Sequence, residues 1–171
     1  AGAGRAARPG GQRGRAAGHR RRRRPVTGSA LLLDVNALLA LGWAEHEAHA
    51  RVVQRLSRHT ALRWATCPIT QLGFIRISST SGIFSRSLSP QQAQAALAAL
   101  CQDRQHHFLG EHPSVLDCSF AELQGPRQTT DAYLVALARH HGLRLLTLDK
   151  RLANTFADAP LEWLETEGEA P

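Results

Sequence analysis

The fold is decided by the stretch Ala30-Leu31-Leu32-Leu33-Asp34-Val35-Asn36, in which four apolar residues lead directly into a carboxylate. A short, continuously apolar run of this kind is typical of a strand buried on both faces, as in parallel sheets. Asp34 would then lie at the carboxyl end of the strand, where the loops of an open α/β sheet form a crevice for ligands. A second stretch, Leu143–Asp149, repeats the pattern and predicts a second carboxylate at the same edge.

Between these two stretches, expected strands alternate with expected helices. Residues 62–67 predict a strand, and Pro68 suits the first position of the helix after it. Ser89, followed by a proline, has the residue types that begin a further helix. Thr129-Thr130-Asp131 opens the clearest helix, with a threonine as its cap, and Gly142 ends it. The alternation predicts an α/β fold with a parallel sheet covered on both faces.

Other segments have competing interpretations. The helix expected over residues 45–59 carries His46 and His49 on one face, where they could bind a metal, although solvent-facing or packing roles are favoured. Val115-Leu116-Asp117 could form a short strand, with its aspartate as a structural or turn residue. Residues 161–164 predict a strand at the edge of the sheet.

The positive charge of the chain belongs to its amino-terminal segment. The 171 residues have a formal net charge of +7, but residues 1–28 hold nine of the 21 basic residues and no acidic one. The rest has 12 basic residues against 14 acidic ones, so a broad phosphate-binding face on the fold is not expected. We expect residues 1–28 to be a disordered Arg/Gly-rich tail, residues 29–165 to form one domain, and residues 166–171 to be a frayed acidic end.

The Arg-rich segment has three further interpretations. It could be a nucleic-acid-binding arm. It could also be an export signal, but Asp34 and Asn36 interrupt the apolar stretch that a signal requires. The absence of an initiator Met leaves open that the segment is vector or upstream sequence.

The cysteine content points to a reducing compartment. There are three cysteines, an odd number, and no C-x-x-C pair. This argues against a disulfide framework or a zinc knuckle and predicts a cytoplasmic location. No apolar run approaches the roughly 18 residues of a membrane span, so no membrane association is expected.

The predicted topology brings three carboxylates together. Asp34 and Asp149 end strands, and Asp131 lies at the start of a helix that enters from the same edge. Without a counter-charge they would repel one another, whereas Mg²⁺ or Mn²⁺ takes oxygen ligands and removes the conflict. Such an ion suits phosphodiester hydrolysis. The competing interpretation is structural, because aspartate is common in turns and at helix starts.

Four stretches in this order carry a family resemblance: Leu33–Leu41, Thr66–Arg76, Arg127–Leu134 and Leu145–Asp149. Together they resemble a PIN-domain nuclease of the VapC toxin type, over roughly residues 30–165. The resemblance implies a three-layer α/β/α fold with a central, mostly parallel sheet. It also implies Mg²⁺-dependent endoribonuclease activity on exposed RNA, a VapB-type antitoxin as partner, and a homodimer.

The resemblance assigns roles to single residues. By position, Asp34, Asp131 and Asp149 match the metal-binding, catalytic acids of the family. Asn36 and Thr147 match polar neighbours that would hold those acids in place. These roles are implied by the resemblance.

One position departs from the family. Gln71 stands where the family usually has a further acid, commonly Glu, and an uncharged amide predicts weaker metal affinity. The departure motivates an alternative, a catalytically weakened PIN-fold protein that binds RNA or a partner. A neighbouring acid such as Glu45 could compensate. Arg76 and Arg127 are candidates for contacting RNA phosphates.

A third hypothesis is an aspartyl-phosphate phosphatase of the haloacid-dehalogenase type, whose nucleophile also ends a first strand. That family requires a second aspartate two residues after the first, and here the residue is Asn36. It also requires a lysine before the late acids, whereas Lys150 follows Asp149. Both departures disfavour it.

Overall fold

The computed structural model describes residues 30–120, 123 and 125–165. The predictions for residues 1–28 and 166–171 lie outside the described residues. Within the described ranges, no helix combines the length and apolar character needed to cross a membrane.

The described residues form a sheet of five strands in which every neighbouring pair is parallel. Leu32 of the central strand pairs with Ala65 on one side and with Leu145 on the other. The chain first builds the sheet on one side of the central strand and then on the other, which creates the switch point where α/β sheets bind ligands. In the order β3-β2-β1-β4-β5, the strands are His106–Phe108, Arg63–Thr66, Ala30–Leu33, Arg144–Thr147 and Leu161–Trp163.

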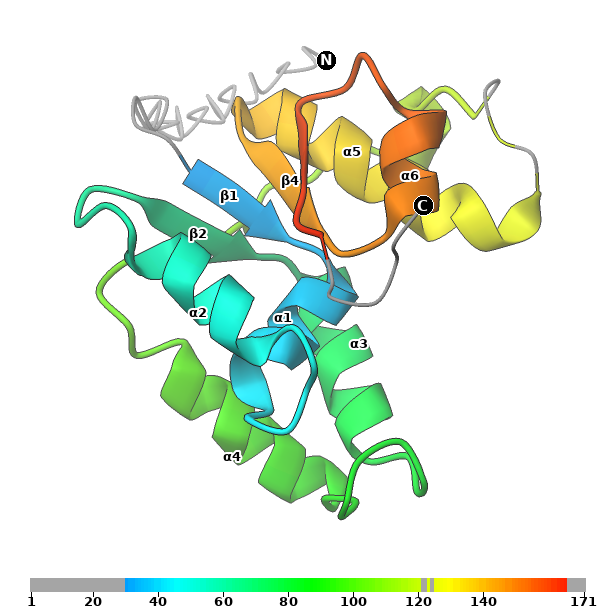
Figure 1. Cartoon of the computed structure of the whole chain (residues 1–171). Coiled ribbons are helices and arrows are strands. Elements are labelled where there is room, and N and C mark those ends of the chain that lie inside the picture. Colours follow the sequence, from blue (N-terminus) through cyan, green and yellow to red (C-terminus); the bar gives the residue numbers. More distant parts are fainter. Residues whose placement is uncertain (1–29, 121–122, 124, 166–171) are drawn as a thin grey trace, which may run out of the picture.

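Helices cover both faces of this sheet (Figure 1). Four lie on one face: α1 (Val35–Gly42), α2 (His49–Ser57), α3 (Pro68–Ser78) and α4 (Pro90–Leu100). The opposite face carries α5 (Thr129–His141) and α6 (Lys150–Thr155). The predicted three-layer α/β/α architecture is therefore confirmed.

The continuous apolar run of β1 is explained by burial on both of its faces. Leu31 and Leu33 pack with Trp64 in the core under α1 to α4. Leu32 packs with Leu145 in the second core, under α5. All of these side chains are almost fully buried. A strand between two helical layers has no solvent-facing side, so its sequence shows no polar alternation.

The start of α4 is as predicted, and the start of α5 is not. The Ser89 hydroxyl accepts a hydrogen bond from the backbone N–H of Gln92, whose side chain in turn accepts from the N–H of Ser89. In α5 no threonine caps the helix, because a 3₁₀ turn precedes it and the Thr129 hydroxyl donates to the carbonyl of Pro126. Gly142 ends this helix in the left-handed conformation, with φ +67°.

The two histidines of the candidate metal-binding pair each contact the backbone. The helix expected over residues 45–59 is shorter, because residues before His49 form turns. His46 Nδ1 accepts from the backbone N–H of Ala48, and His49 Nδ1 is hydrogen-bonded to the carbonyl of Ala40 at 2.8 Å. Each ring is thus hydrogen-bonded to the backbone, which supports the packing interpretation.

The segment between α4 and α5 differs most from expectation. Val115–Asp117 is a 3₁₀ turn and not a strand, and its Leu116 is 91% exposed. Strand β3 was not predicted, because its residues His106-His107-Phe108 form a short run without the β-branched pattern of a strand. The expected edge strand is confirmed as β5, which pairs with β4.

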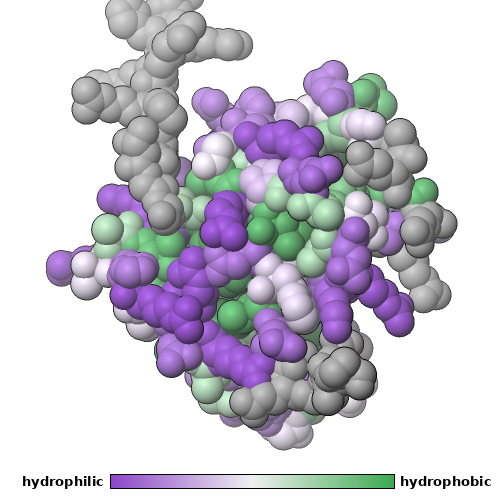
Figure 2. Space-filling view, turned by 45° about the horizontal axis from the view of Figure 1, so that its top comes forward, coloured by the Kyte–Doolittle hydropathy of each residue, from purple (hydrophilic) through white to green (hydrophobic). Residues whose placement is uncertain are grey.

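Hydrophilic residues cover most of the face drawn in Figure 2, and hydrophobic residues show between them in small patches. Among the described residues, the large hydrophobic side chains with substantial exposure come from several elements. They are Val53, Leu72, Ile83, Phe108, Val115, Leu116 and Phe120.

Candidate active site

Asp34 is held rigidly at the carboxyl end of β1, where it caps helix α1. Its Oδ1 accepts a hydrogen bond from the backbone N–H of Ala37, and its Oδ2 accepts one from the hydroxyl of Thr147. Its own N–H donates to the carbonyl of Leu146 at 3.0 Å. The side chain is only 5% exposed, so its position is set by these contacts.

Thr147 links this carboxylate to the next strand. It is fully buried, and its hydroxyl also accepts from the backbone N–H of Asp149 at 3.0 Å. Oδ1 of Asp149 accepts from the N–H groups of Arg151 and Leu152 and thereby caps α6. In the described part of the chain, no hydrogen-bond donor contacts the other oxygen, Oδ2. One carboxylate oxygen of Asp149 is thus left for a ligand.

Asp131 joins the pair from the opposite helical layer. It is half-buried in the first turn of α5, near the carboxyl ends of β1 and β4. Its charge acts on Asp34, and the charge of Asp149 acts on both. The three aspartates are therefore close enough for their charges to interact.

Burial and mutual repulsion disfavour the ionised form of these acids. Burial raises the pKa of Asp34 to about 6, against the opposing hydrogen bonds from Thr147 and Ala37, and the charges of Asp131 and Asp149 raise it further. Burial, and then the charge of Asp149, also raises the pKa of Asp131. Among the described residues, no basic side chain contributes to either shift. A cation at this edge would relieve the repulsion.

The donors fit a hard divalent cation that keeps part of its water shell. Carboxylate oxygens are the ligands that Mg²⁺ and Mn²⁺ prefer. Among the described residues, no group of three His, Cys, Asp or Glu side chains forms a ready-made metal centre. Mg²⁺ does not require one, because it is usually bound through one or two carboxylates together with waters and substrate phosphates.

Gln71 lies in the first turn of α3 but does not bond to the aspartates. Its Nε2 donates to the hydroxyl of Thr66 at 3.0 Å, and this hydroxyl also contacts Nε2 of His106 at 2.9 Å. Neither Thr66 nor His106 was predicted from the sequence to belong to the site. One signal was available, because Thr66 ends β2 in the same way that Thr147 ends β4.

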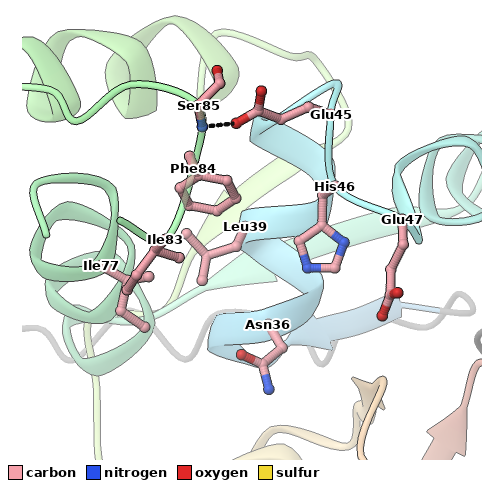
Figure 3. Close-up of a pocket in the computed structure, with 9 residues that line it drawn as sticks. All are labelled: Asn36, Leu39, Glu45, His46, Glu47, Ile77, Ile83, Phe84 and Ser85. Carbon is pink, nitrogen blue, oxygen red and sulfur yellow. Dashed lines mark hydrogen bonds between the residues drawn. The ribbon is translucent and has the colours of Figure 1, made fainter. Parts of the chain in front are cut away.

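Asn36 makes no hydrogen bond to the acids within the described residues. It is exposed on α1 and lines a pocket of about 580 Å³ together with Glu45, His46 and the segment around Ser85 (Figure 3). Glu45 lines the same pocket as Asn36 and accepts from the backbone N–H of Ser85 at 2.7 Å, and its compensation for the acid missing at position 71 stays a prediction.

The two arginines proposed to contact RNA stay predictions. Arg76 is exposed in the last turn of α3. The side chain of Arg127 lies outside what the structure describes.

The known proteins that this chain resembles in sequence belong to one family. The PIN domain family matches residues 31–156. Ribonuclease VapC38 of Mycobacterium tuberculosis is 40% identical over 136 residues, which cover 78% of this chain and 96% of that protein. Ribonuclease VapC44 of the same organism is 39% identical over 127 residues, which cover 72% of this chain and 89% of that protein.

Solved structures show the same fold. VapBC-1 from nontypeable Haemophilus influenzae matches with a TM-score of 0.55 and 17% identity, over 80% of this chain and 97% of that chain. Mycobacterium tuberculosis VapC20 matches with a TM-score of 0.52 and 14% identity, over 72% of this chain and 93% of that chain. From its sequence relatives and its fold, this chain belongs to the VapC ribonucleases of the PIN-domain family.

Proposed function

We propose that this VapC-family ribonuclease toxin cuts exposed, unpaired RNA with the help of Mg²⁺, or Mn²⁺, held by Asp34, Asp131 and Asp149. The observation that carries the proposal is the electrostatics of these acids. Asp34 and Asp149 follow the strands at the switch point of the sheet, the charges of the three acids repel, and no basic residue among the described ones offsets the repulsion at Asp34 or Asp131. A bound divalent cation would offset this repulsion between the carboxylates.

Each residue of the site has a defined task in this proposal. Thr147 holds Oδ2 of Asp34 and the backbone of Asp149, so the two carboxylates keep a constant separation. Oδ2 of Asp149 and the carboxylates of Asp34 and Asp131 would hold the ion and its water shell. When bound, the ion activates water and stabilises the charge that develops on a phosphoryl oxygen. Unpaired RNA is the substrate class whose phosphates can enter such a crevice.

The proposed partners follow from the family. A VapB-type antitoxin would block the site, and two copies of the chain would form a homodimer. Arg76 and Arg127 would contact phosphates on either side of the cut. The three free cysteines, Cys67, Cys101 and Cys118, support a reducing cytoplasmic compartment.

A second candidate function is supported by Gln71. Its amide is hydrogen-bonded to Thr66 of β2 and not to the acids. The position where the family usually has a fourth acid is therefore filled by a neutral group. A PIN-fold protein that binds RNA or a partner without cutting would have this property.

One cleavage assay separates the two candidates. The full chain is incubated with an RNA that contains unpaired loops, in Mg²⁺, in Mn²⁺ and in chelator, beside the Asp34→Asn and Asp149→Asn variants. The matched control is Asp117→Asn, because Asp117 is exposed on the 3₁₀ turn. We expect metal-dependent cleavage by the parent and the control only. RNA binding without metal-dependent cleavage would support the second candidate instead.

A further inference from the structure

The hydroxyl of Thr66 links the side chains of Gln71 and His106. Thr66 is completely buried at the end of β2. Its hydroxyl contacts Nε2 of Gln71 at 3.0 Å and Nε2 of His106 at 2.9 Å. A hydroxyl has one proton to donate and two lone pairs. It can therefore accept from the Gln71 amide and donate its one proton to His106.

The environment of His106 sets the direction of its bond. The ring packs against Trp64 with centroids 4.6 Å apart, and the indole N–H of Trp64 is anchored on Asp103 at 3.0 Å. Burial lowers the pKa of His106, which favours the neutral ring. Because the Gln71 amide donates to Thr66, the hydroxyl proton of Thr66 is available for Nε2 of His106. A neutral imidazole that accepts at Nε2 carries its own proton at Nδ1.

The same bonds show which end of the Gln71 amide faces Thr66. The amide presents its NH₂ group to the hydroxyl. The carbonyl oxygen Oε1 is left as an acceptor, and no described residue donates to it. Gln71 follows β2, which is the neighbour of β1 and of its terminal Asp34. Amide oxygens are ligands that hard cations and their waters accept.

We propose that Thr66 and His106 are positioning residues that act through Gln71. Together they fix its carboxamide so that Oε1, and not the NH₂ group, is offered to the hydrated divalent ion at the carboxyl end of the sheet. The inference rests on the proposed function for the identity of the ion. The hydrogen-bond directions are independent of it.

The first test is spectroscopic and needs no ion. In the ¹⁵N-labelled full chain at neutral pH, His106 should be the tautomer protonated at Nδ1, and the side-chain NH₂ of Gln71 should be protected from exchange. Thr66→Val should remove that protection, and Thr66→Ser should restore it. The matched control is Thr70→Val: Thr70 is also fully buried, but its hydroxyl bonds only to the backbone of Cys67.

The second test measures Mg²⁺ binding by calorimetry. Thr66→Val and Gln71→Ala should each weaken affinity by about 10-fold. The double variant should be no weaker than either, because both changes remove the same interaction. Thr70→Val should leave affinity unchanged.

Several results would overturn the proposal. They are a His106 tautomer protonated at Nε2 in the parent, an unchanged Gln71 amide in Thr66→Val, and additive losses of affinity. The tautomer is read in the parent protein, so it decides the matter even if a variant does not fold. If the parent shows the predicted His106 tautomer and a protected Gln71 amide but binds no Mg²⁺, the proposed function and the role of the amide in metal binding are refuted. The directions of the hydrogen bonds would still be correct.

Discussion

The hydroxyl of Thr147 is hydrogen-bonded to Oδ2 of Asp34 across a separation of 113 residues in the chain. This contact joins the ends of β4 and β1, the two strands that flank the switch point of the sheet. Thr66 occupies the corresponding place at the end of β2, where its hydroxyl accepts a hydrogen bond from the amide of Gln71. Buried threonines at strand ends thus orient both the acids and the amide that borders them.

Asp34→Asn should stabilise the metal-free protein while abolishing its activity. At neutral pH the parent holds a buried carboxylate against two other acids, and the variant removes that charge. Asparagine is also a good helix cap, so the bond to Ala37 can be retained. We expect unfolding in chelator to cost about 1–3 kcal/mol more than in the parent, and cleavage to fall at least about 100-fold.

Chemical denaturation with and without Mg²⁺ measures the stability of the two proteins. The parent should gain stability from Mg²⁺, whereas the variant should gain little. A variant that is less stable than the parent in chelator would mean that the hydrogen bonds of Asp34 outweigh the repulsion.

The contribution of Asp34 to the stability of the metal-free protein should fall as the pH rises from about 4 to about 7. Burial raises the pKa of Asp34 to about 6 in the folded protein, from the ordinary aspartate value of 3.8. Between these values the folded state binds more protons than the unfolded state, so raising the pH favours unfolding. The full effect of this group is about 3 kcal/mol. Saturating Mg²⁺ should reverse the trend, because the ion favours the charged carboxylates.

The effect of Asp34 is isolated by comparing the parent with Asp34→Asn at each pH. Burial lowers the pKa values of His46 and His106, and these groups favour unfolding when the pH falls below about 6.5. Their contribution is common to both proteins and cancels in the difference. A difference that does not change between pH 4 and pH 7 would contradict the raised pKa.

The fold could be predicted because its signals are local and repeated. Two buried strands that end in aspartate, the cap at Ser89 and the stop at Gly142 each follow from one short stretch, and all four occur in the structure. Strand β3 could not be predicted, since His106 to Phe108 becomes a strand only through its pairing with β2. That contact is tertiary and leaves no periodic pattern in the sequence.

The acidic residues of the site could be predicted from the sequence, but the side chains that hold the site in position could not. Placing Asp34 and Asp149 at one edge required only strand ends in a parallel sheet. The partner of Gln71 depends on which side chains of β2 and β3 meet, as Thr66 and His106 do. Asn36 was expected to support the acids, but its place on the exposed side of α1 follows from where the helix begins.

Gly73→Ala should destabilise the protein and reduce activity, because α3 crosses α1 closely at this glycine. A methyl group there would lie 2.6 Å from a methyl carbon of Val35, the residue after Asp34. Overpacking costs about 1–3 kcal/mol, and the better helix propensity of alanine offsets up to about 1 kcal/mol of it. Denaturation in urea and cleavage assays measure the two effects.

The control for this prediction is Gly110→Ala. A methyl group at Gly110 would meet only the Phe108 ring, at an ordinary 3.8 Å, so stability should change by less than about 0.5 kcal/mol. If Gly73→Ala loses stability but keeps full activity, then Val35 can move without displacing Asp34.

Gln71→Glu should bind Mg²⁺ more tightly than the parent and be less stable without it. The variant places a fourth carboxylate at the end of β2, which strengthens the attraction for a cation and adds repulsion when none is bound. A carboxylate has no proton to donate to Thr66, so it must either take the hydroxyl proton from His106 or leave the hydroxyl. In both cases the side chain loses its present anchor.

Calorimetry with Mg²⁺ and denaturation in chelator measure these two effects, with Gln71→Ala as the control that lacks both charge and amide. Affinity in the order Gln71→Glu, parent, Gln71→Ala would place position 71 within reach of the ion. Equal affinity in all three proteins would instead place Gln71 outside the site, as a residue that only joins α3 to β2. The cleavage chemistry would then depend on Asp34, Asp131 and Asp149 alone.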